Sequence, residues 1–180
     1  MGRAHAPSIA ERLLGKAELK LGAARELYDK GFFEDSASRS YYAMFHAARA
    51  ALSKVGVTTR THEGTVSEFG RRLVLEGVFP RDLGRALAEA KAARETYEYS
   101  ATMEIQRDEA EAILRDAERF VSQVKSQLRS LKPQTTADLA GSGAKKAGVQ
   151  GMKRVLDSMR SEDWNHVRRS PLHRTLLSFK

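Results

Sequence analysis

Three glycines divide the first part of the chain into segments with helical periodicity. Gly31, Gly56 and Gly77 each follow a segment in which apolar residues recur every three or four positions. Glycine is common just beyond the end of a helix, because it adopts the left-handed backbone conformation without strain. The pattern predicts helices over residues 8–30, 33–55 and 62–76. Within residues 8–131 no alternation of apolar and polar residues favours a strand.

The same periodicity predicts two further helices, over about residues 80–99 and 107–131. Pro80 fits the first turn of the earlier one, where its missing N–H is tolerated. Ser8 and Glu11 have the spacing of a capping box at the start of the first helix. Short connections between long amphipathic helices favour antiparallel neighbours. We therefore expect an all-α fold, an up-and-down bundle of four to five helices.

The composition changes after residue 131. Residues 132–180 hold 10 of the 31 Lys and Arg residues but only 4 of the 23 Asp and Glu residues, so most of the net charge of +8 lies there. Pro133 and the Gly-rich residues 141–146 are typical of a linker. We expect a helical bundle over residues 1–131 and a basic, partly disordered tail over residues 132–180. The tail could add phosphate contacts to RNA, remain a solvated extension, or fold residues 152–159 onto a partner.

Several classes of protein are disfavoured by composition. No apolar run approaches the roughly 20 residues of a membrane span, and the first residues lack the apolar segment of a secretory signal. The absence of cysteine excludes disulfides and thiolate metal sites, and it fits a reducing cytoplasm. The five histidines show no metal-ligand spacing, and there is no Gly-rich phosphate loop. We expect a cytoplasmic protein without a membrane segment, metal or cofactor.

Arg39 and His46 lie seven residues apart in the second predicted helix. At about 100° per residue they fall only about 20° short of two full turns, so both side chains point the same way, roughly 10 Å apart along the axis. A guanidinium that stays charged and an imidazole that titrates near neutrality can hold a phosphate and move a proton beside it. This pair is the candidate catalytic pair.

Small residues accompany the pair along the helix. They stand at alternating spacings of three and four with Arg39 and His46, and they are Ser36, Ala43, Ala50 and Ser53. Small side chains let another helix approach closely, so we predict that these residues form the interface of a homodimer. In such a dimer Arg39 of one subunit would lie near His46 of the other, and both would line one cleft.

The residues around the pair resemble the HEPN domain family (higher eukaryotes and prokaryotes nucleotide-binding). Residues 38–50, Ser-Arg-Ser-Tyr-Tyr-Ala-Met-Phe-His-Ala-Ala-Arg-Ala, fit the family motif of an Arg and a His separated by four to six residues, with six here. The similarity continues through residues 61–64, 94–99 and 108–124. It covers about residues 8–130.

The resemblance implies a helical bundle that dimerises through the motif helix. Many such domains are metal-independent endoribonucleases, often toxins or defence effectors, which cleave RNA by attack of the ribose 2′-OH on the adjacent phosphate. Arg39 would then stabilise the phosphate and His46 would be the acid and base. Many relatives are encoded beside a nucleotidyltransferase antitoxin that in some pairs adenylylates a tyrosine two residues after the motif His, where this chain has Ala48. Other members may bind only nucleotides or partner proteins, so a non-catalytic module is the alternative function.

Four further residues are candidates for contacts with RNA or a nucleotide: Tyr42, Arg49, His62 and Arg94. Each also has an ordinary structural reading. Arg49 could be a solvated charge, Tyr42 could pack at a helix contact, and His62 could belong to the start of the third helix. Arg94 could form an internal salt bridge beside packed tyrosines. Arg39 and His46 could themselves be ordinary polar residues of an exposed helix face.

Overall fold

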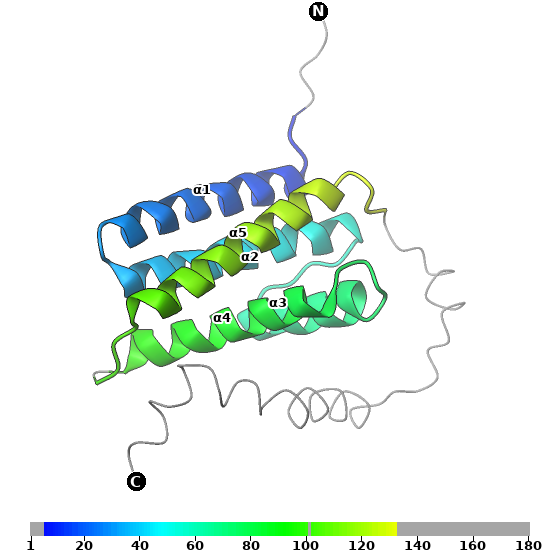
Figure 1. Ribbon diagram of the computed structural model, residues 1–180. Coiled ribbons are helices and arrows are strands. Elements are labelled where there is room, and N and C mark those ends of the chain that lie inside the picture. The colour runs from blue at the N-terminus through cyan, green and yellow to red at the C-terminus, as the bar shows by residue number, and fades with distance from the viewer. Residues whose placement is uncertain (1–5, 101, 133–180) are drawn as a thin grey trace, which may run out of the picture. The chain divides into compact units, whose positions relative to one another are not determined.

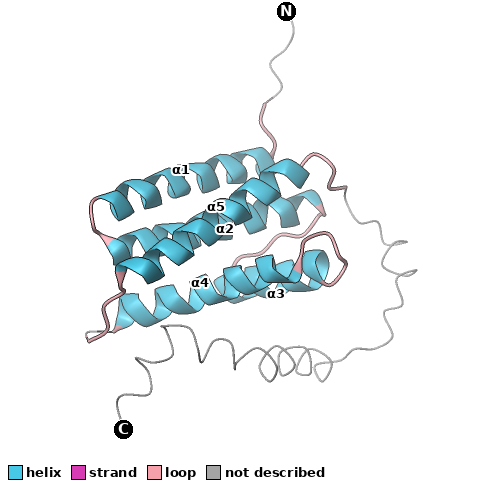
Figure 2. Cartoon of the chain, viewed as in Figure 1, coloured by secondary structure: helices cyan, strands magenta, loops and turns pink. Residues whose placement is uncertain are grey.

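The computed structural model describes residues 6–100 and 102–132, which form a bundle of helices (Figure 1). In chain order these are α1 (Ile9–Asp29), α2 (Phe33–Lys54), α3 (His62–Phe69), the π-helical turn η1 (Gly70–Val74), α4 (Arg81–Tyr99) and α5 (Arg107–Gln127). The described residues contain no strand (Figure 2). The predicted all-α fold is confirmed.

Local interactions set most helix ends where the sequence indicates them. The Ser8 hydroxyl accepts a hydrogen bond from the N–H of Glu11, and the Glu11 carboxylate accepts one from the N–H of Ser8 at 2.7 Å. Gly31, Gly56 and Gly77 all have positive φ, at 82°, 81° and 73°. These are left-handed conformations that residues with a Cβ rarely adopt. The capping box and the three glycine stops are therefore confirmed.

Three boundaries differ from the prediction. The third helix widens into η1, where the N–H of Leu75 bonds to the carbonyl of Gly70 at 2.9 Å, and the adjacent side chains of Leu73 and Val74 are both buried. Pro80 is extended, with ψ of 154°, so it precedes α4 and is not part of its first turn. The last helix ends at Gln127, four residues before the predicted end.

Helix α2 lies at the centre of the bundle and contacts α1, α3, α4 and α5. The bulky side of α2 forms the core, with Tyr41, Met44 and Leu52 fully buried. Three further rings, those of Phe69, Phe79 and Phe120, complete the core, with Phe69 centred 5.4 Å from Phe79 and 5.1 Å from Phe120. Because neighbours cover most of α2, little of its circumference is left for the surface.

The small residues of α2 pack inside the chain. Ser36, Ala43 and Ala50 are all 0% exposed, and the Ser36 hydroxyl donates to the carbonyl of Ala24 in α1 at 2.8 Å. The facing part of α1 is also small, with Ala17 and Ala24 fully buried. The close neighbour that small side chains permit is thus α1 of the same chain. The prediction that Ser36, Ala43 and Ala50 form an interface between two copies is wrong, because they have no surface left to offer.

The predicted basic tail lies outside the described residues from residue 133 onward. The domain boundary near residue 131 and the alternatives for the tail therefore stay predictions. In the described part of the chain, no helix is long and apolar enough to cross a membrane.

Candidate functional site

Helix α2 keeps one stripe at the surface. Between residues 35 and 53 the side chains that are not buried are Asp35, Ser38, Arg39, Tyr42, His46, Arg49 and Ser53. At about 100° per residue these positions fall in a sector about 100° wide, and the buried small residues lie just beyond its edge. Four of the six predicted site residues, Arg39, Tyr42, His46 and Arg49, share this stripe. Ser53 lies on it too, and its hydroxyl donates to the carbonyl of Ala50.

His46 is partly buried within this stripe. Its Nδ1 is buried without a hydrogen-bond partner among the described residues, which leaves Nε2 as the nitrogen that a substrate can reach. Burial lowers the pKa of His46, and the positive charges of Arg49, Lys16 and Lys20 lower it further. The imidazole is therefore neutral at neutral pH and can accept a proton.

Arg39 lies two helical turns before His46. It is partly exposed and forms no ion pair with any residue in the described ranges. The separation of roughly 10 Å along the axis is too long for Arg39 and His46 of one chain to contact the same phosphate oxygen comfortably. The Arg39 guanidinium is thus available to bind an anion. In a bound strand, that anion would be one or two phosphate groups away from the atom that His46 contacts.

His62 is held beside α2 by contacts at the start of α3. The Thr61 side chain caps the helix by accepting from the N–H of Gly64 at 3.0 Å. The imidazole of His62 stacks on Phe45, with ring centres 4.5 Å apart, and its Nδ1 lies 2.6 Å from the Tyr41 hydroxyl. Burial raises the pKa of Tyr41, so the hydroxyl keeps its proton and donates to Nδ1. The neutral imidazole of His62 then carries its own proton on Nε2.

The Phe45 ring packs against the imidazoles of both His46 and His62. The His46 ring is centred 5.5 Å from the Phe45 ring, nearly edge-on, and the guanidinium carbon of Arg49 lies 5.5 Å from the centre of the same ring. His46, His62 and Arg49 therefore gather around one aromatic side chain. Burial, followed by the charge of Arg94, also lowers the pKa of His62. The chain thus brings two neutral imidazoles and one cation together on α2 and α3.

Arg94 takes the structural role that the sequence left open. Its guanidinium carbon lies 5.2 Å from the Tyr42 ring centre and 5.8 Å from that of Tyr41. It also forms an ion pair with Glu98 at 2.5 Å, and its side chain is only 11% exposed. Arg94 therefore packs against the ring face of Tyr42. Although it is largely buried, its positive charge also acts on His62.

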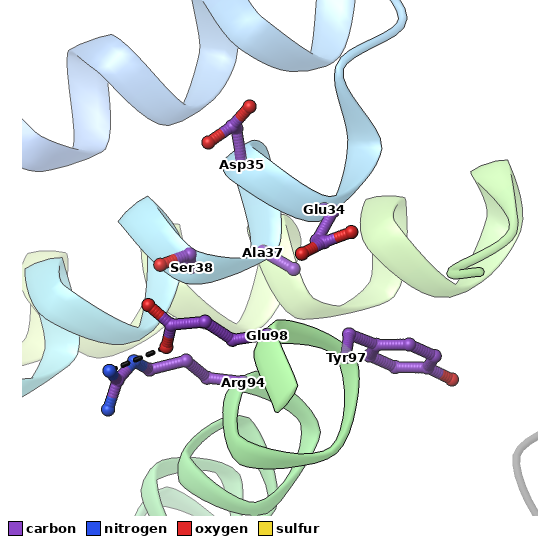
Figure 3. A pocket seen from close by; sticks show the side chains of 7 residues that line it. All are labelled: Glu34, Asp35, Ala37, Ser38, Arg94, Tyr97 and Glu98. Atoms are coloured by element: carbon purple, nitrogen blue, oxygen red, sulfur yellow. Dashed lines mark ion pairs between the residues drawn. The ribbon is translucent and has the colours of Figure 1, made fainter. Parts of the chain in front are cut away.

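A small hollow of about 60 Å³ lies beside Arg94 (Figure 3). Its lining consists of Glu34, Asp35, Ala37, Ser38, Arg94, Tyr97 and Glu98. In Figure 3 the guanidinium of Arg94 meets the carboxylate of Glu98, while the Tyr97 ring points away from both. Three carboxylates repel a phosphate, and the volume is well below the roughly 300 Å³ of small ligand pockets. The hollow does not fit a nucleotide, so the exposed stripe of α2 is the candidate site.

Comparison with known proteins identifies the family. The HEPN domain profile matches residues 10–127, which span the bundle from α1 to the end of α5. The chain belongs to the HEPN domain family. The resemblance seen around Arg39 and His46 is thereby confirmed over most of the described chain.

This HEPN protein has relatives in bacteria and archaea. It is 37% identical over 110 residues to a UPF0332 protein of Gloeobacter violaceus, a match that covers 61% of this chain and 87% of the relative. Two proteins of Methanocaldococcus jannaschii, both named as candidate toxins, are each 32% identical to it. Those matches cover 67% of this chain and 82% and 90% of the relatives.

Two lysines of α1 also reach the site of this HEPN domain, although nothing in the pattern of α2 indicates them. The charges of Lys16 and Lys20 both act on His46. In the sequence they appear only as two basic residues four positions apart on the first predicted helix. Their place beside His46 depends on how α1 packs against α2. Among the described residues, no group of His, Asp and Glu side chains could hold a metal ion.

Proposed function

We propose that this HEPN protein is a metal-independent endoribonuclease that acts as the toxin or effector of a toxin–antitoxin or defence system. The observation that carries the proposal is the state of His46. Burial and neighbouring cations lower its pKa, and the stripe that presents it also carries Arg39. A neutral imidazole beside cations suits proton removal next to a phosphodiester. The toxin names of two relatives support the biological role.

His46 would begin the reaction by taking the proton of a ribose 2′-OH on Nε2. The 2′-oxygen then attacks the adjacent phosphorus, and the bond from phosphorus to the 5′-oxygen breaks. The imidazolium returns its proton to the departing 5′-oxygen, which leaves a 2′,3′-cyclic phosphate and a 5′-hydroxyl. Arg39 would stabilise the negative charge that develops on the non-bridging oxygens.

A second copy of the chain would complete the site. Because Arg39 and His46 of one chain lie two turns apart, a homodimer would bring Arg39 of one subunit beside His46 of the other. The contact would be made by the exposed stripe of α2, since the small residues of that helix are covered by α1. Tyr42 and Arg49 would then lie within the shared cleft and contact RNA.

The test is cleavage of RNA in the presence of EDTA, with analysis of the product ends. We expect cutting by the unaltered protein, 2′,3′-cyclic phosphate ends, and loss of cutting in His46→Ala. The matched control is Ser122→Ala, which alters an exposed polar side chain of α5 outside the stripe and should cut normally. Thermal melting of both variants shows whether the bundle is intact. Cutting that survives in His46→Ala would reject the assignment.

A non-catalytic module that binds a nucleotide or docks a nucleotidyltransferase antitoxin is the second candidate. The observation in its favour is that Nδ1 of His46 has no hydrogen-bond partner among the described residues, whereas catalytic imidazoles are usually oriented by one. Such docking would not use adenylylation next to the motif, since Ala48 has no hydroxyl group to modify and is 0% exposed. RNA binding without cutting by the unaltered protein, together with co-purification of a nucleotidyltransferase, would favour this candidate.

A further inference from the structure

Four basic side chains gather on the face of α1 and α2 around His46, with the carboxylate of Asp35 at the start of the stripe of α2. In the described part of the chain Lys16, Lys20, Arg39 and Arg49 form no ion pair. Several cations elsewhere are paired, as in Arg25–Glu118 at 2.6 Å, Lys125–Glu18 at 2.5 Å and Lys91–Glu63 at 2.7 Å. Four cations without an ion pair among the described residues thus lie on this face.

The packing of α1 against α2 brings the two lysines level with the motif pair. The helices run antiparallel (Figure 1), and the hydrogen bond from Ser36 to Ala24 shows which residues stand opposite each other. Counting back along α1 and forward along α2 from that bond, Lys20 stands level with the residue after Arg39. By the same count Lys16 stands two residues before the level of His46. The lysines, about 6 Å apart along the axis, therefore span the interval between Arg39 and His46.

The side of α1 that carries these lysines is free of α5. Glu18 and Arg25 mark the flank that faces α5, through their ion pairs with Lys125 and Glu118. At about 100° per residue, Lys16 and Lys20 each lie about 160° around the helix from Glu18. Lys16 is exposed and Lys20 is partly exposed. Both ammonium groups are therefore on the surface that continues from the stripe of α2.

We propose that Lys16 and Lys20 bind phosphates of a single-stranded RNA that passes from the exposed stripe of α2 onto α1. The proposal rests on the proposed function, which supplies the RNA strand. Ammonium groups are compact point charges that suit phosphate contacts independent of base sequence. The two lysines hold the strand beside the stripe, so that a phosphodiester lies within reach of His46.

The experiment measures binding apart from cleavage, in the His46→Ala protein and in EDTA. The probe is a fluorescent single-stranded RNA of about 15 nucleotides, and its anisotropy gives the dissociation constant from about 50 to about 200 mM salt. Lys16→Gln/Lys20→Gln should raise the dissociation constant on the order of tenfold at the lowest salt. It should also reduce the slope of log affinity against log salt by about 1.4, or about 0.7 for each lost phosphate contact.

The matched control is Lys30→Gln/Lys125→Gln, which removes the same number of positive charges. Lys30 directly follows α1, and Lys125 lies on α5 at the flank of α1 that faces α5. The slope of this control variant should equal that of the parent protein. If the two double variants bind alike, the α1 site is wrong, even if the unaltered protein cuts RNA. If the slopes differ as expected but the unaltered protein never cuts RNA, the enzyme assignment fails and the α1 site stands as a binding surface.

Discussion

Replacement of Ala43 by leucine tests what covers the small side of α2. Ala43 is 0% exposed, on the side of α2 where Ser36 bonds to Ala24 of α1. Leucine adds three carbon atoms to a position with no free surface. It can fit only if α1 moves outward or neighbouring side chains leave their preferred rotamers. Ala43→Leu should therefore weaken folding of the single chain.

The expected size follows from overpacking. Extra methylene groups in a close-packed interior cost about 1–3 kcal/mol of unfolding free energy. For a helical bundle of this size each 1 kcal/mol corresponds to about 3–5 °C, so the melting temperature should fall by about 3–15 °C. Leucine and alanine have similar helix propensities, so little of the loss would come from the helix itself.

Urea denaturation followed by circular dichroism measures the change, and light scattering measures the mass in solution. The matched control is Ala112→Leu, the same replacement at an exposed position of α5, which should stay within about 0.5 kcal/mol of the parent. The reasoning would be refuted if Ala43→Leu unfolded like the parent while the mass in solution fell to that of a monomer. That result would mean that a second copy, not α1, covers Ala43.

Three further changes test the local chemistry. Tyr41→Phe removes the hydrogen bond to Nδ1 of His62, so it should cost about 1 kcal/mol in urea unfolding and raise the pKa of His62 in an NMR titration; an unchanged titration would contradict the assigned bond. The folded-state pKa of His46 lies below its ordinary value of 6.5, so the unfolded chain binds more protons and stability should fall as the pH drops through that value. His46→Gln should reduce this dependence of the unfolding free energy on pH, as measured by urea denaturation at several pH values. An unchanged dependence would mean that other titratable groups cause it. Ser8→Ala breaks the capping box with Glu11 and should cost about 1 kcal/mol, and melting that matches the parent would argue against the cap.

The helix ends could be read from the sequence because they depend on neighbouring residues. A capping box joins Ser8 to Glu11 within one turn, and a glycine such as Gly31 ends a helix through its own backbone conformation. The wide turn at η1 and the extended conformation of Pro80 escaped prediction. There, buried residues such as Leu73 and Val74 are placed by contacts with distant parts of the chain.

The sequence by itself determined that Arg39 and His46 share a helix face, because that follows from the pitch of one helix. It also showed that something packs closely against Ser36, Ala43 and Ala50, since only a close neighbour makes use of such small side chains. Only the tertiary structure decided that the neighbour is α1, which also carries Lys16 and Lys20 to the interval between Arg39 and His46. The physical reason is that the size of the side chains on a helix face determines how closely a neighbouring segment can pack against it. Their size does not determine which segment of the chain that neighbour is.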